Sequence, residues 1–393
     1  MNWPAVSLGE ISAHIRNGAS IKQSKDASGL PVTRIETIAQ REVNLEKCGF
    51  ANIGDDEYRN YRLSSGDILI SHINSEKHLG KCAIYESARS DVVHGMNLLC
   101  LRPVKDKVFP KYLFYCISSP SFTRLLPAIS KKSVNQASFT VSAFKGLKVP
   151  LPPLEEQKRI ATILDKADAI RRKRQQAIQL ADEFLRAVFL DMFGDPVTNP
   201  KGWEVKPLKQ LARVTTGNTP LRKEEKFYGD HIEWIKSDNI NTPSHFLTAA
   251  SESLSAEGKK VARVVGKGSI LVTCIAGSFD CIGNVAYADR EVAFNQQINA
   301  LTPLDSVTSW FLYALILFSK KHIQSASTNS MKGMVSKGKM EEIPMICPPR
   351  SIQETFQEAF LKFLSVTEDL GCSFAGTSDV FDSISQRAFS GEI

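Results

Sequence analysis

The sequence predicts an α+β protein with two tandem α/β domains. They are separated by two long helices packed as an antiparallel coiled coil, with a pseudo-twofold internal repeat. Three observations predict this class: similar patterns recur about 200 residues apart, a proline cluster closes each half, and a helical segment follows each cluster. Such repeats predict a duplicated fold. The expected segments are residues 1–150, 151–196, 197–345 and 346–393.

The two globular stretches are similar in pattern rather than in identity. WPAVSLGEISAHIRNGASIK begins at Trp3 and resembles WEVKPLKQLARVTTGNTPLRK, which begins at Trp203. Further on, SSGDILISHINSEKHLGKCAIYE (Ser64–Glu86) matches GKGSILVTCIAGSFDCIGNVAYAD (Gly266–Asp289). Each of the latter has a Gly-led strand, a loop, a second glycine and another strand of alternating β-formers. We therefore expect one scaffold with two different surfaces.

The first helical segment begins after the prolines of VPLPPLEEQKRI, since proline is excluded from a helix interior. Glu155 and Glu156 suit the positive N-terminal end of a helix. From Glu155 to Met192, 38 residues contain no Gly or Pro, which corresponds to about 57 Å of helix. Apolar or small residues recur by sevens and predict a coiled-coil seam: Ile160, Ala167, Ala181 and Val188, with Arg174 intervening, and Ile163, Ile170, Ala177 and Phe184.

The second helical segment runs from about Ser351 to Phe389 and is the weaker pattern. GCSFAGT (Gly371–Thr377) should break or kink it, because glycine disfavours helix. A long amphipathic helix needs a partner for its apolar face. We predict that the two segments pair antiparallel and hold the two globular domains at opposite ends.

The positive charge lies in the globular domains. The chain has 393 residues and a net charge of +7. Residues 1–150 carry 20 Lys and Arg against 13 Asp and Glu, and residues 197–345 carry 18 against 14. The first helical segment is neutral and the last is acidic. A polyanionic ligand would therefore bind the globular domains.

The chain has the composition of a cytoplasmic protein. No signal peptide is visible at the start. The longest apolar run, Trp310–Phe318, has nine residues and is too short to span a bilayer. The eight cysteines show no C-x-x-C pair and no zinc spacing, so we expect reduced, mostly buried thiols.

No catalytic constellation stands out in the sequence. A P-loop is missing, and so is an amino-methyltransferase signature. Asp195, followed by Glu204 and Lys206, imitates a nuclease D…E-x-K pattern, but it falls between a helix end and a domain start. The histidines have no spacing typical of a metal site or a triad. We expect no catalytic residues, no metal site and no chemistry by this chain itself.

Three stretches carry a resemblance to a known family. VPLPPLEEQKRIATIL, TTGNTPLRKEEKFYGDHIEWIKSDNI (Thr215–Ile240) and MKGMVSKGKMEEIPM (Met331–Met345) resemble segments of the specificity subunits of Type I restriction-modification systems. The resemblance covers nearly the whole chain. PPRSIQE departs from the fuller PPLEEQ of the first copy, and the last helix contains glycines. These departures concern the symmetry of partner docking.

The resemblance implies a function in DNA recognition without catalysis. Residues 1–150 and 197–345 would be target recognition domains, each reading one half of a bipartite double-stranded DNA target. The helices would set the spacer and dock two methyltransferase subunits, which restriction subunits would join. No cofactor is expected in this chain; S-adenosylmethionine and ATP with Mg²⁺ are expected on the partner subunits. The candidate docking residues are Ile160, Ile163, Ile170, Ala177, Phe184 and Val188.

Candidate DNA contacts are basic and amide side chains near the expected loops. Arg and Lys bind guanine or phosphate, and Asn and Gln bind adenine edges. Phosphate contacts should outnumber base contacts. The candidates in the first domain are Lys22, Lys25, Arg34, Lys131, Lys132, Asn135 and Gln136. Those in the second are Arg222, Lys223, Lys226, Lys236, Asn239, Asn329, Lys332 and Lys337, with Gln296 and Gln297 beside them. The alternative for each is a solvated loop side chain.

Two other classes of function stay open at this point. The chain would be an endonuclease or methyltransferase if it cleaved or methylated DNA alone. It would be a coiled-coil scaffold if it bound only protein, and salt-dependent DNA binding would exclude that class.

Overall fold

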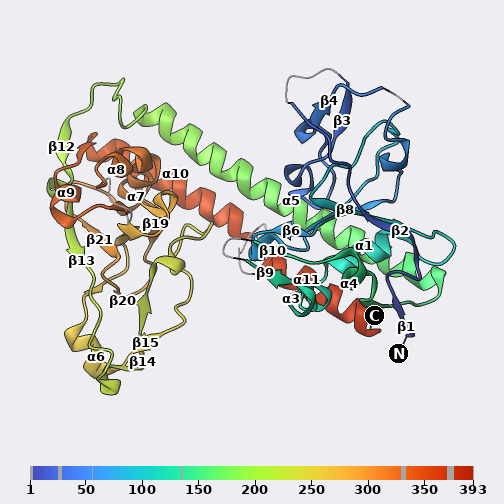
Figure 1. Cartoon of the computed structure of the whole chain (residues 1–393). Helices are drawn as coiled ribbons and strands as arrows, with labels where there is room; N and C mark the ends of the chain where they lie inside the picture. Colours follow the sequence, from blue (N-terminus) through green and yellow to red (C-terminus); the bar gives the residue numbers. More distant parts are fainter. Residues whose placement is uncertain are drawn as a thin grey trace. The chain divides into compact units, whose positions relative to one another are not determined.

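The computed structural model describes residues 3–24, 29–54, 56–133, 136–328, 333–369 and 376–392. They form two compact units (Figure 1). Unit 1 comprises Met1–Lys173 with Ala375–Ile393, and unit 2 comprises Arg174–Phe374. Each unit contains sheets and helices, so the predicted α+β class is confirmed.

Unit 1 is built on an antiparallel sheet in the order β2-β8-β5-β7, covered by short helices. Its first and last strands, β1 and β11, pair antiparallel. The strands are β1 (Ala5–Ser7), β2 (Ser12–Asn17), β3 (Leu30–Val32), β4 (Gly49–Ala51), β5 (Ile68–Ser71), β6 (Ile73–Asn74), β7 (Cys82–Ile84), β8 (Leu98–Pro103), β9 (Lys131–Lys132), β10 (Ala137–Ser138) and β11 (Lys148–Pro150). The helices are α1 (Pro110–Ser118), α2 (Pro120–Thr123), α3 (Leu126–Ile129), α4 (Val141–Lys145), the first part of α5 (Leu154–Phe193), and α11 (Gly376–Ser390).

Unit 2 repeats this plan. Its central sheet has the order β13-β21-β17-β19, and β12 pairs with β23 as β1 pairs with β11. The strands are β12 (Val205–Pro207), β13 (Ala212–Thr216), β14 (Tyr228–Ile235), β15 (Ser253–Leu254), β16 (Val264–Val265), β17 (Ile270–Thr273), β18 (Ile275–Ala276), β19 (Val285–Tyr287), β20 (Val292–Phe294), β21 (Ile298–Pro303), β22 (Gly333–Met334) and β23 (Pro344–Ile346). The helices are the remainder of α5, α6 (Ala256–Val261), α7 (Ser309–Phe318), α8 (Lys320–Ser325), α9 (Lys337–Glu341) and α10 (Arg350–Asp369).

Corresponding glycines show the duplication at atomic detail. A Cβ on Gly18 would lie 2.0 Å from the carbonyl oxygen of Gly95, and one on Gly217 would lie 2.1 Å from that of Asn295. No real Cβ contact is this short, so both positions require glycine because another backbone segment passes there. The two turns belong to the two stretches that the sequence comparison matched.

A buried glutamine joins the start of α5 to unit 1. Gln157 is 0% exposed. Its Oε1 accepts a hydrogen bond from the backbone N–H of Phe109 at 2.7 Å, and its Nε2 donates to the carbonyl of Pro152 at 2.8 Å and that of Lys107 at 3.3 Å. The glutamine of PPLEEQ therefore fixes the proline turn and the chain before α1 to the first turn of the long helix.

Gln353 repeats this arrangement at the start of α10. It is also 0% exposed. Its Oε1 accepts from the backbone N–H of Thr308 at 2.9 Å, and its Nε2 donates to the carbonyls of Pro348 at 2.8 Å and Ser306 at 3.2 Å. The altered second signature, PPRSIQE, thus keeps the one side chain that makes these bonds.

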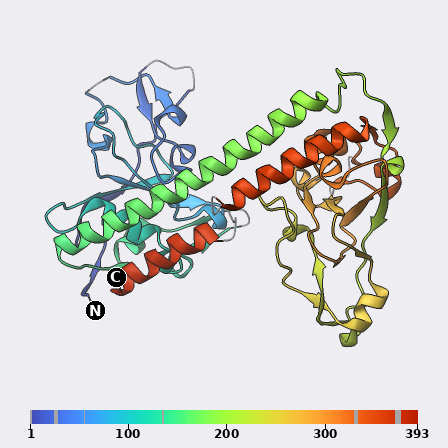
Figure 2. The same cartoon turned by 180° about the vertical axis from the view of Figure 1, so that it is seen from behind.

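The predicted long central helix is confirmed as α5, which has 40 residues. In unit 1 its buried residues include Ile160 and Leu164, and its neighbour is α11. In unit 2, Phe189 and Phe193 of α5 pack edge-on against Phe356 of α10 at 5.6 and 5.4 Å between ring centroids. There α5 and α10 run antiparallel (Figure 2). The predicted break at Gly371–Thr377 falls largely on residues outside those described; α10 ends at Asp369 and α11 begins at Gly376.

Candidate nucleic-acid interface

In unit 1, the chain between the Gly18 turn and the first short 3-10 helix carries three candidates, two of which lie among the described residues. Lys22 is exposed. Arg34 lies just after β3 and is half-buried, and its Nε donates to Oε1 of Gln23 at 2.7 Å. Lys25 lies outside the described residues. Arg34 is therefore held in place by a neighbouring amide, whereas Lys22 extends into solvent.

A second group lies on the short hairpin of β9 and β10. Lys131, Lys132 and Gln136 are all exposed. Lys132 forms an ion pair with Glu76 at 2.6 Å, in which both side chains are more than half exposed. Such surface pairs contribute little to stability, so Lys132 can exchange its carboxylate for a phosphate at small cost. Asn135 lies outside the described residues.

In unit 2, two candidate cations meet on one carboxylate. Arg222 Nη1 lies 2.8 Å from Oε2 of Glu252, and Lys236 Nζ donates to Oε1 of the same side chain at 2.7 Å. The guanidinium of Arg222 lies 4.9 Å from the ring centroid of Tyr228 and 4.8 Å from that of Trp234. These hydrogen bonds, that of Lys236 first, hold the pKa of Glu252 below its usual value. The carboxylate stays ionised.

Other basic candidates in unit 2 are exposed. Lys223 precedes the 3-10 helix Glu225–Phe227, which contains Lys226 and leads into β14. Lys226 pairs with Glu224 at 3.2 Å. Lys337 begins α9 and pairs with Glu341 at 3.6 Å. Glu224 is exposed and Glu341 is half-buried, so solvent and salt screen the first pair more than the second. Asn329 and Lys332 lie outside the described residues.

The amide candidates of unit 2 make hydrogen bonds within the unit. Asn239 is 6% exposed; its Oδ1 accepts from the backbone N–H of Lys236 and its Nδ2 donates to the carbonyl of Ala249 at 2.9 Å. These bonds keep its side chain inside the loop. Oε1 of Gln297 accepts from Nδ2 of Asn295 at 3.1 Å.

No motif or periodicity in the sequence marks Gln23 or Glu252 as a site residue. Glu252 stands in AASESLSAEG, a polar stretch without periodicity, 16 residues after Lys236. Only the pairing of β15 with β14 brings it against the two cations. Trp234 is 3% exposed and lies in a small apolar cluster, so it is a core residue of unit 2.

Some of the candidate docking residues lie on the buried face of α5 and others on its exposed face. Ile160 is 0% exposed and belongs to the core of unit 1. Ile163, Ala177 and Val188 are half-buried. Ile170 is 55% exposed and Phe184 is 61% exposed. An exposed Leu180 lies one turn before Phe184, so part of the predicted seam is an apolar stripe on the outer face of α5.

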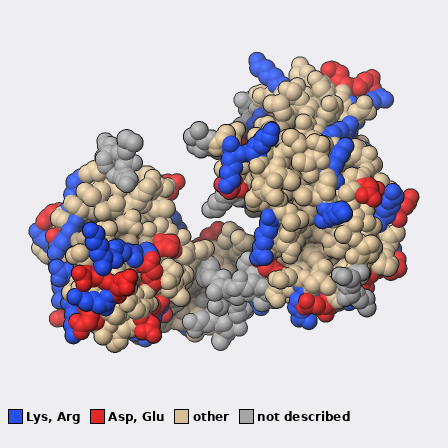
Figure 3. Space-filling view, turned by 60° about the horizontal axis from the view of Figure 1, so that its bottom comes forward, with Lys and Arg blue, Asp and Glu red and all other residues tan. Residues whose placement is uncertain are grey.

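Charge is distributed differently on the visible faces of the two units. In Figure 3, one end of unit 2 carries basic and acidic side chains side by side. The visible face of unit 1 shows basic side chains scattered over a mostly uncharged surface. Independently of that view, Lys132, Lys226 and Lys337 each form an ion pair with a carboxylate of the chain. Anion binding at these sites would compete with carboxylates of the chain itself.

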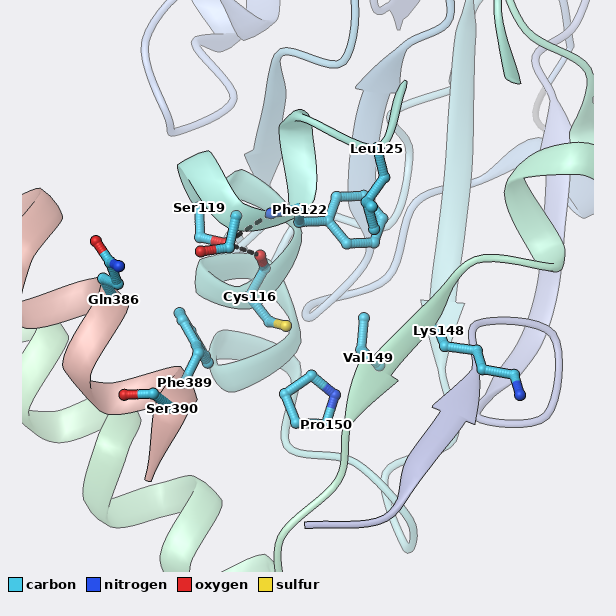
Figure 4. Close-up of a pocket in the computed structure, with 11 residues that line it drawn as sticks. Cys116, Ser119, Phe122, Leu125, Lys148, Val149, Pro150, Gln386, Phe389 and Ser390 are labelled. Carbon is cyan, nitrogen blue, oxygen red and sulfur yellow. Dashed lines mark hydrogen bonds between the residues drawn. The ribbon is translucent and has the colours of Figure 1, made fainter. Parts of the chain in front are cut away.

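A pocket of about 290 Å³ lies in unit 1 between α1, α2, β11 and α11 (Figure 4). Cys116, Phe122, Val149 and Phe389 line it, and the half-exposed Leu125 stands at its side. Its lining is mostly apolar, with Ser119 hydrogen-bonded back to its own helix. Burial raises the pKa of the Cys116 thiol to about 12, so this sulfur is not a nucleophile.

The nuclease-like pattern has a structural explanation. Oδ1 of Asp195 accepts from the backbone N–H groups of Val197 and Thr198, each at 2.9 Å. These bonds, that of Thr198 first, lower the pKa of Asp195. Lys206 forms an ion pair with Glu204 at 2.9 Å. The aspartate thus shapes the turn after α5.

The part of the chain that the structure describes contains neither a metal-ligand cluster nor a membrane-spanning helix. Among those residues, no group of three or more His, Cys, Asp or Glu is placed to hold a metal ion. No helix there combines the length and apolarity needed to cross a bilayer.

The fold defines a class of protein with two similar α+β units, and comparison with known proteins gives the family. A model of the Type I restriction modification DNA specificity domain matches residues 1–180 and 200–370. The chain belongs to this family, as the resemblance predicted. Membership favours the non-catalytic DNA-specificity function over a nuclease, a methyltransferase or a scaffold.

Relatives match along most of the chain. A putative type I restriction enzyme MjaX specificity subunit of Methanocaldococcus jannaschii is 30% identical over 94% of this chain and 87% of its own length. The type I restriction enzyme HindI specificity subunit of Haemophilus influenzae is 22% identical, with complete coverage of both chains. A crystal structure of the S subunit of a Type I restriction-modification system from M. genitalium has a TM-score of 0.59 at 13% identity, covering 99% of this chain and 96% of that one. It supports the fold alone.

Proposed function

We propose that this chain is the DNA-specificity subunit of a Type I restriction-modification complex, and that each unit reads one half of a bipartite DNA target. The observation that carries the proposal is duplication with divergence. Both units keep the same sheet order, the same turn glycine and the same buried glutamine. Their candidate contact residues differ: a Gln–Arg pair in unit 1 and an Arg–Glu–Lys cluster in unit 2.

The DNA contacts in this proposal are basic and amide side chains near the loops, most of them exposed and two of them, Arg34 and Lys236, half-buried. Most of the lysines would bind phosphate and set the register, while fewer side chains would read bases. The proposed contacts include Lys22, Arg34, Lys131, Lys132, Gln136, Arg222, Lys223, Lys226, Lys236 and Lys337. The candidates Lys25, Asn135, Asn329 and Lys332 lie outside the described residues and stay part of the proposal.

The helices would set the spacer and dock the partner subunits. The exposed Ile170, Leu180 and Phe184 offer apolar surface to two methyltransferase subunits. Restriction subunits would join that complex. We propose that S-adenosylmethionine is bound by the methyltransferase subunits and ATP with Mg²⁺ by the restriction subunits, and that this chain binds none of these cofactors. The complex would work in the cytoplasm, where the target DNA is.

Methylation mapping tests this function. The chain is co-expressed with its neighbouring methyltransferase subunit, and methyladenine is located genome-wide by single-molecule sequencing. We expect a split motif with a fixed gap that disappears when the chain is omitted. No methylation by an assembled complex supplied with cofactor would refute the proposal. A continuous motif would refute the assignment of one half-site to each unit.

A second experiment tests the spacer. Inserting one helical turn after the exposed Gln175 lengthens α5 without touching either globular unit's loops. We expect the gap in the methylated motif to change and both half-sites to persist. An altered half-site would contradict the spacer assignment.

A further inference from the structure

Two positions of the shared scaffold carry different side chains in the two units. Gln23 lies five residues after the turn glycine Gly18, and Arg222 lies five residues after the turn glycine Gly217. Arg34 and Lys236 each precede a short 3-10 helix, Ile35–Ile38 and Ser237–Asn239. Each pair therefore occupies the same place in its own unit.

In both units the two side chains are joined. Gln23 and Arg34 share a direct hydrogen bond of 2.7 Å. Arg222 and Lys236 would repel each other, and Glu252 lies between them with contacts of 2.8 and 2.7 Å. Each group carries a net charge of +1. The scaffold thus presents one linked polar group per unit, with the same charge and different hydrogen-bonding chemistry.

The guanidinium of Arg222 is restrained on several sides. Tyr228 and Trp234 flank it at 4.9 and 4.8 Å, and Glu252 holds Nη1. Its side chain is nonetheless 53% exposed. Planar guanidinium groups that are held in place lose less conformational entropy on binding and donate two parallel hydrogen bonds. The O6 and N7 atoms of guanine are the base-edge acceptors that match such a pair.

We propose that Glu252 is a specificity-determining residue of unit 2. It orients Arg222 toward a guanine of the DNA half-site, and it cancels one positive charge that would otherwise bind phosphate at any sequence. This inference rests on the proposed function of the chain. Glu252 acts through Arg222 and is a positioning residue; Arg222 is the group that contacts the base.

This assignment predicts that removing the charge of Glu252 raises affinity for non-target DNA and lowers discrimination within the target. Glu252→Gln keeps the shape of the side chain and removes its charge. Arg222 and Lys236 are then released to bind phosphate, so affinity for non-target DNA should rise and its salt dependence should steepen, by about 0.9 in log–log slope for each added phosphate contact. Discrimination at one G·C pair should fall by about 5- to 150-fold, the range for a bidentate base contact. A carboxylate that only stabilised the hairpin would change neither.

The experiment uses the full chain in complex with its methyltransferase subunits and the split target found by methylation mapping. Binding is measured by fluorescence anisotropy at several salt concentrations. The duplexes are the target, single base-pair changes across the half-site of unit 2, and a duplex with neither half-site. Glu291→Gln is the matched control, since it removes the same charge from the same unit, where Glu291 pairs with Lys259 at 2.5 Å. Arg222→Lys is the second variant, because it keeps the charge and loses the planar fork.

We expect Glu252→Gln and Arg222→Lys to lose discrimination at the same G·C pair and to keep the half-site of unit 1. Glu291→Gln should keep discrimination at every pair. The inference is overturned if Glu252→Gln discriminates like the unmodified chain, if Glu291→Gln loses as much, or if the half-site of unit 2 contains no G·C pair. The proposed function has a separate check, which is that binding by the unmodified complex depends on the half-sites. If that dependence is absent, both the proposed function and the inference about Glu252 are overturned.

Discussion

Replacing the buried glutamine of unit 2 with leucine should destabilise that unit strongly. Gln353→Leu keeps the size of the side chain and removes three hydrogen bonds. The backbone N–H of Thr308 and the carbonyl of Pro348 are buried and lose their partner, whereas Ser306 is exposed and can bind water. A buried polar group without a partner costs about 1–3 kcal/mol. We therefore expect a loss of about 3 kcal/mol, since leucine recovers part of the cost by apolar burial.

The measurement is chemical unfolding combined with hydrogen exchange, which assigns the loss to one unit. For a unit of this size, about 3 kcal/mol corresponds to a fall in melting temperature of about 6–12 °C. Gln157→Leu should produce a similar loss in unit 1, because Gln157 makes the matching bonds to Phe109 and Pro152. Gln175→Leu, at an exposed position of α5, is the control and should change stability by less than about 0.5 kcal/mol. A loss for Gln353→Leu no larger than that of the control would refute this account of the signature glutamine.

Four further outcomes test other features. Lys132→Ala should weaken binding to all DNA sequences and reduce the salt slope by about 0.9; an unchanged slope in a titration would place this hairpin away from phosphate. Phe184→Glu should leave the fold intact by circular dichroism and weaken capture of the methyltransferase subunit by at least about tenfold; undiminished capture would show that the exposed apolar residues of α5 do not bind the methyltransferase subunit. Gly217→Ala should cost at least about 2 kcal/mol in denaturant unfolding, because its Cβ would meet a backbone carbonyl at 2.1 Å, while Gly338→Ala, with open space around it, should not. Burial lowers the pKa of His94 to about 4, below its unfolded value, so stability is complete above about pH 6.5 and falls as the pH drops toward 4; His94→Gln should flatten that decline in thermal melts.

The duplication and the long helix were predictable because they depend on local chemistry. Prolines 150, 152 and 153 end a strand, and the following run contains only residues compatible with helix. Turn glycines such as Gly18 and Gly217 mark equivalent points of a repeated chain. These signals are short-range, so they survive in one sequence without comparison to others.

The face that each helix buries was not predictable from its heptads alone. Of the two sets of heptad positions in α5, the one that begins at Ile160 has that residue in a core, as expected of a seam. In the set that begins at Ile163, Ile170 and Phe184 are exposed. A helix that covers a globular unit over part of its length buries the residues nearest that unit, and periodicity does not say which neighbour it meets. The buried carboxylate of Asp168, 3% exposed among Arg41, Arg171 and Arg172, likewise follows from the meeting of α5 with a loop far away in sequence.

The sequence by itself determined the two-copy architecture, the basic character of the globular units and the family, since these follow from motifs, composition and spacing. Only the tertiary structure decided which polar side chains meet. Lys236 and Arg222 were candidates as separate cations, and Glu252 was not a candidate at all. Strand pairing joins the three into one group, because β15 returns beside β14 after a loop without a pattern. Contacts across such distances depend on the register of the folded backbone, which local residue chemistry does not encode.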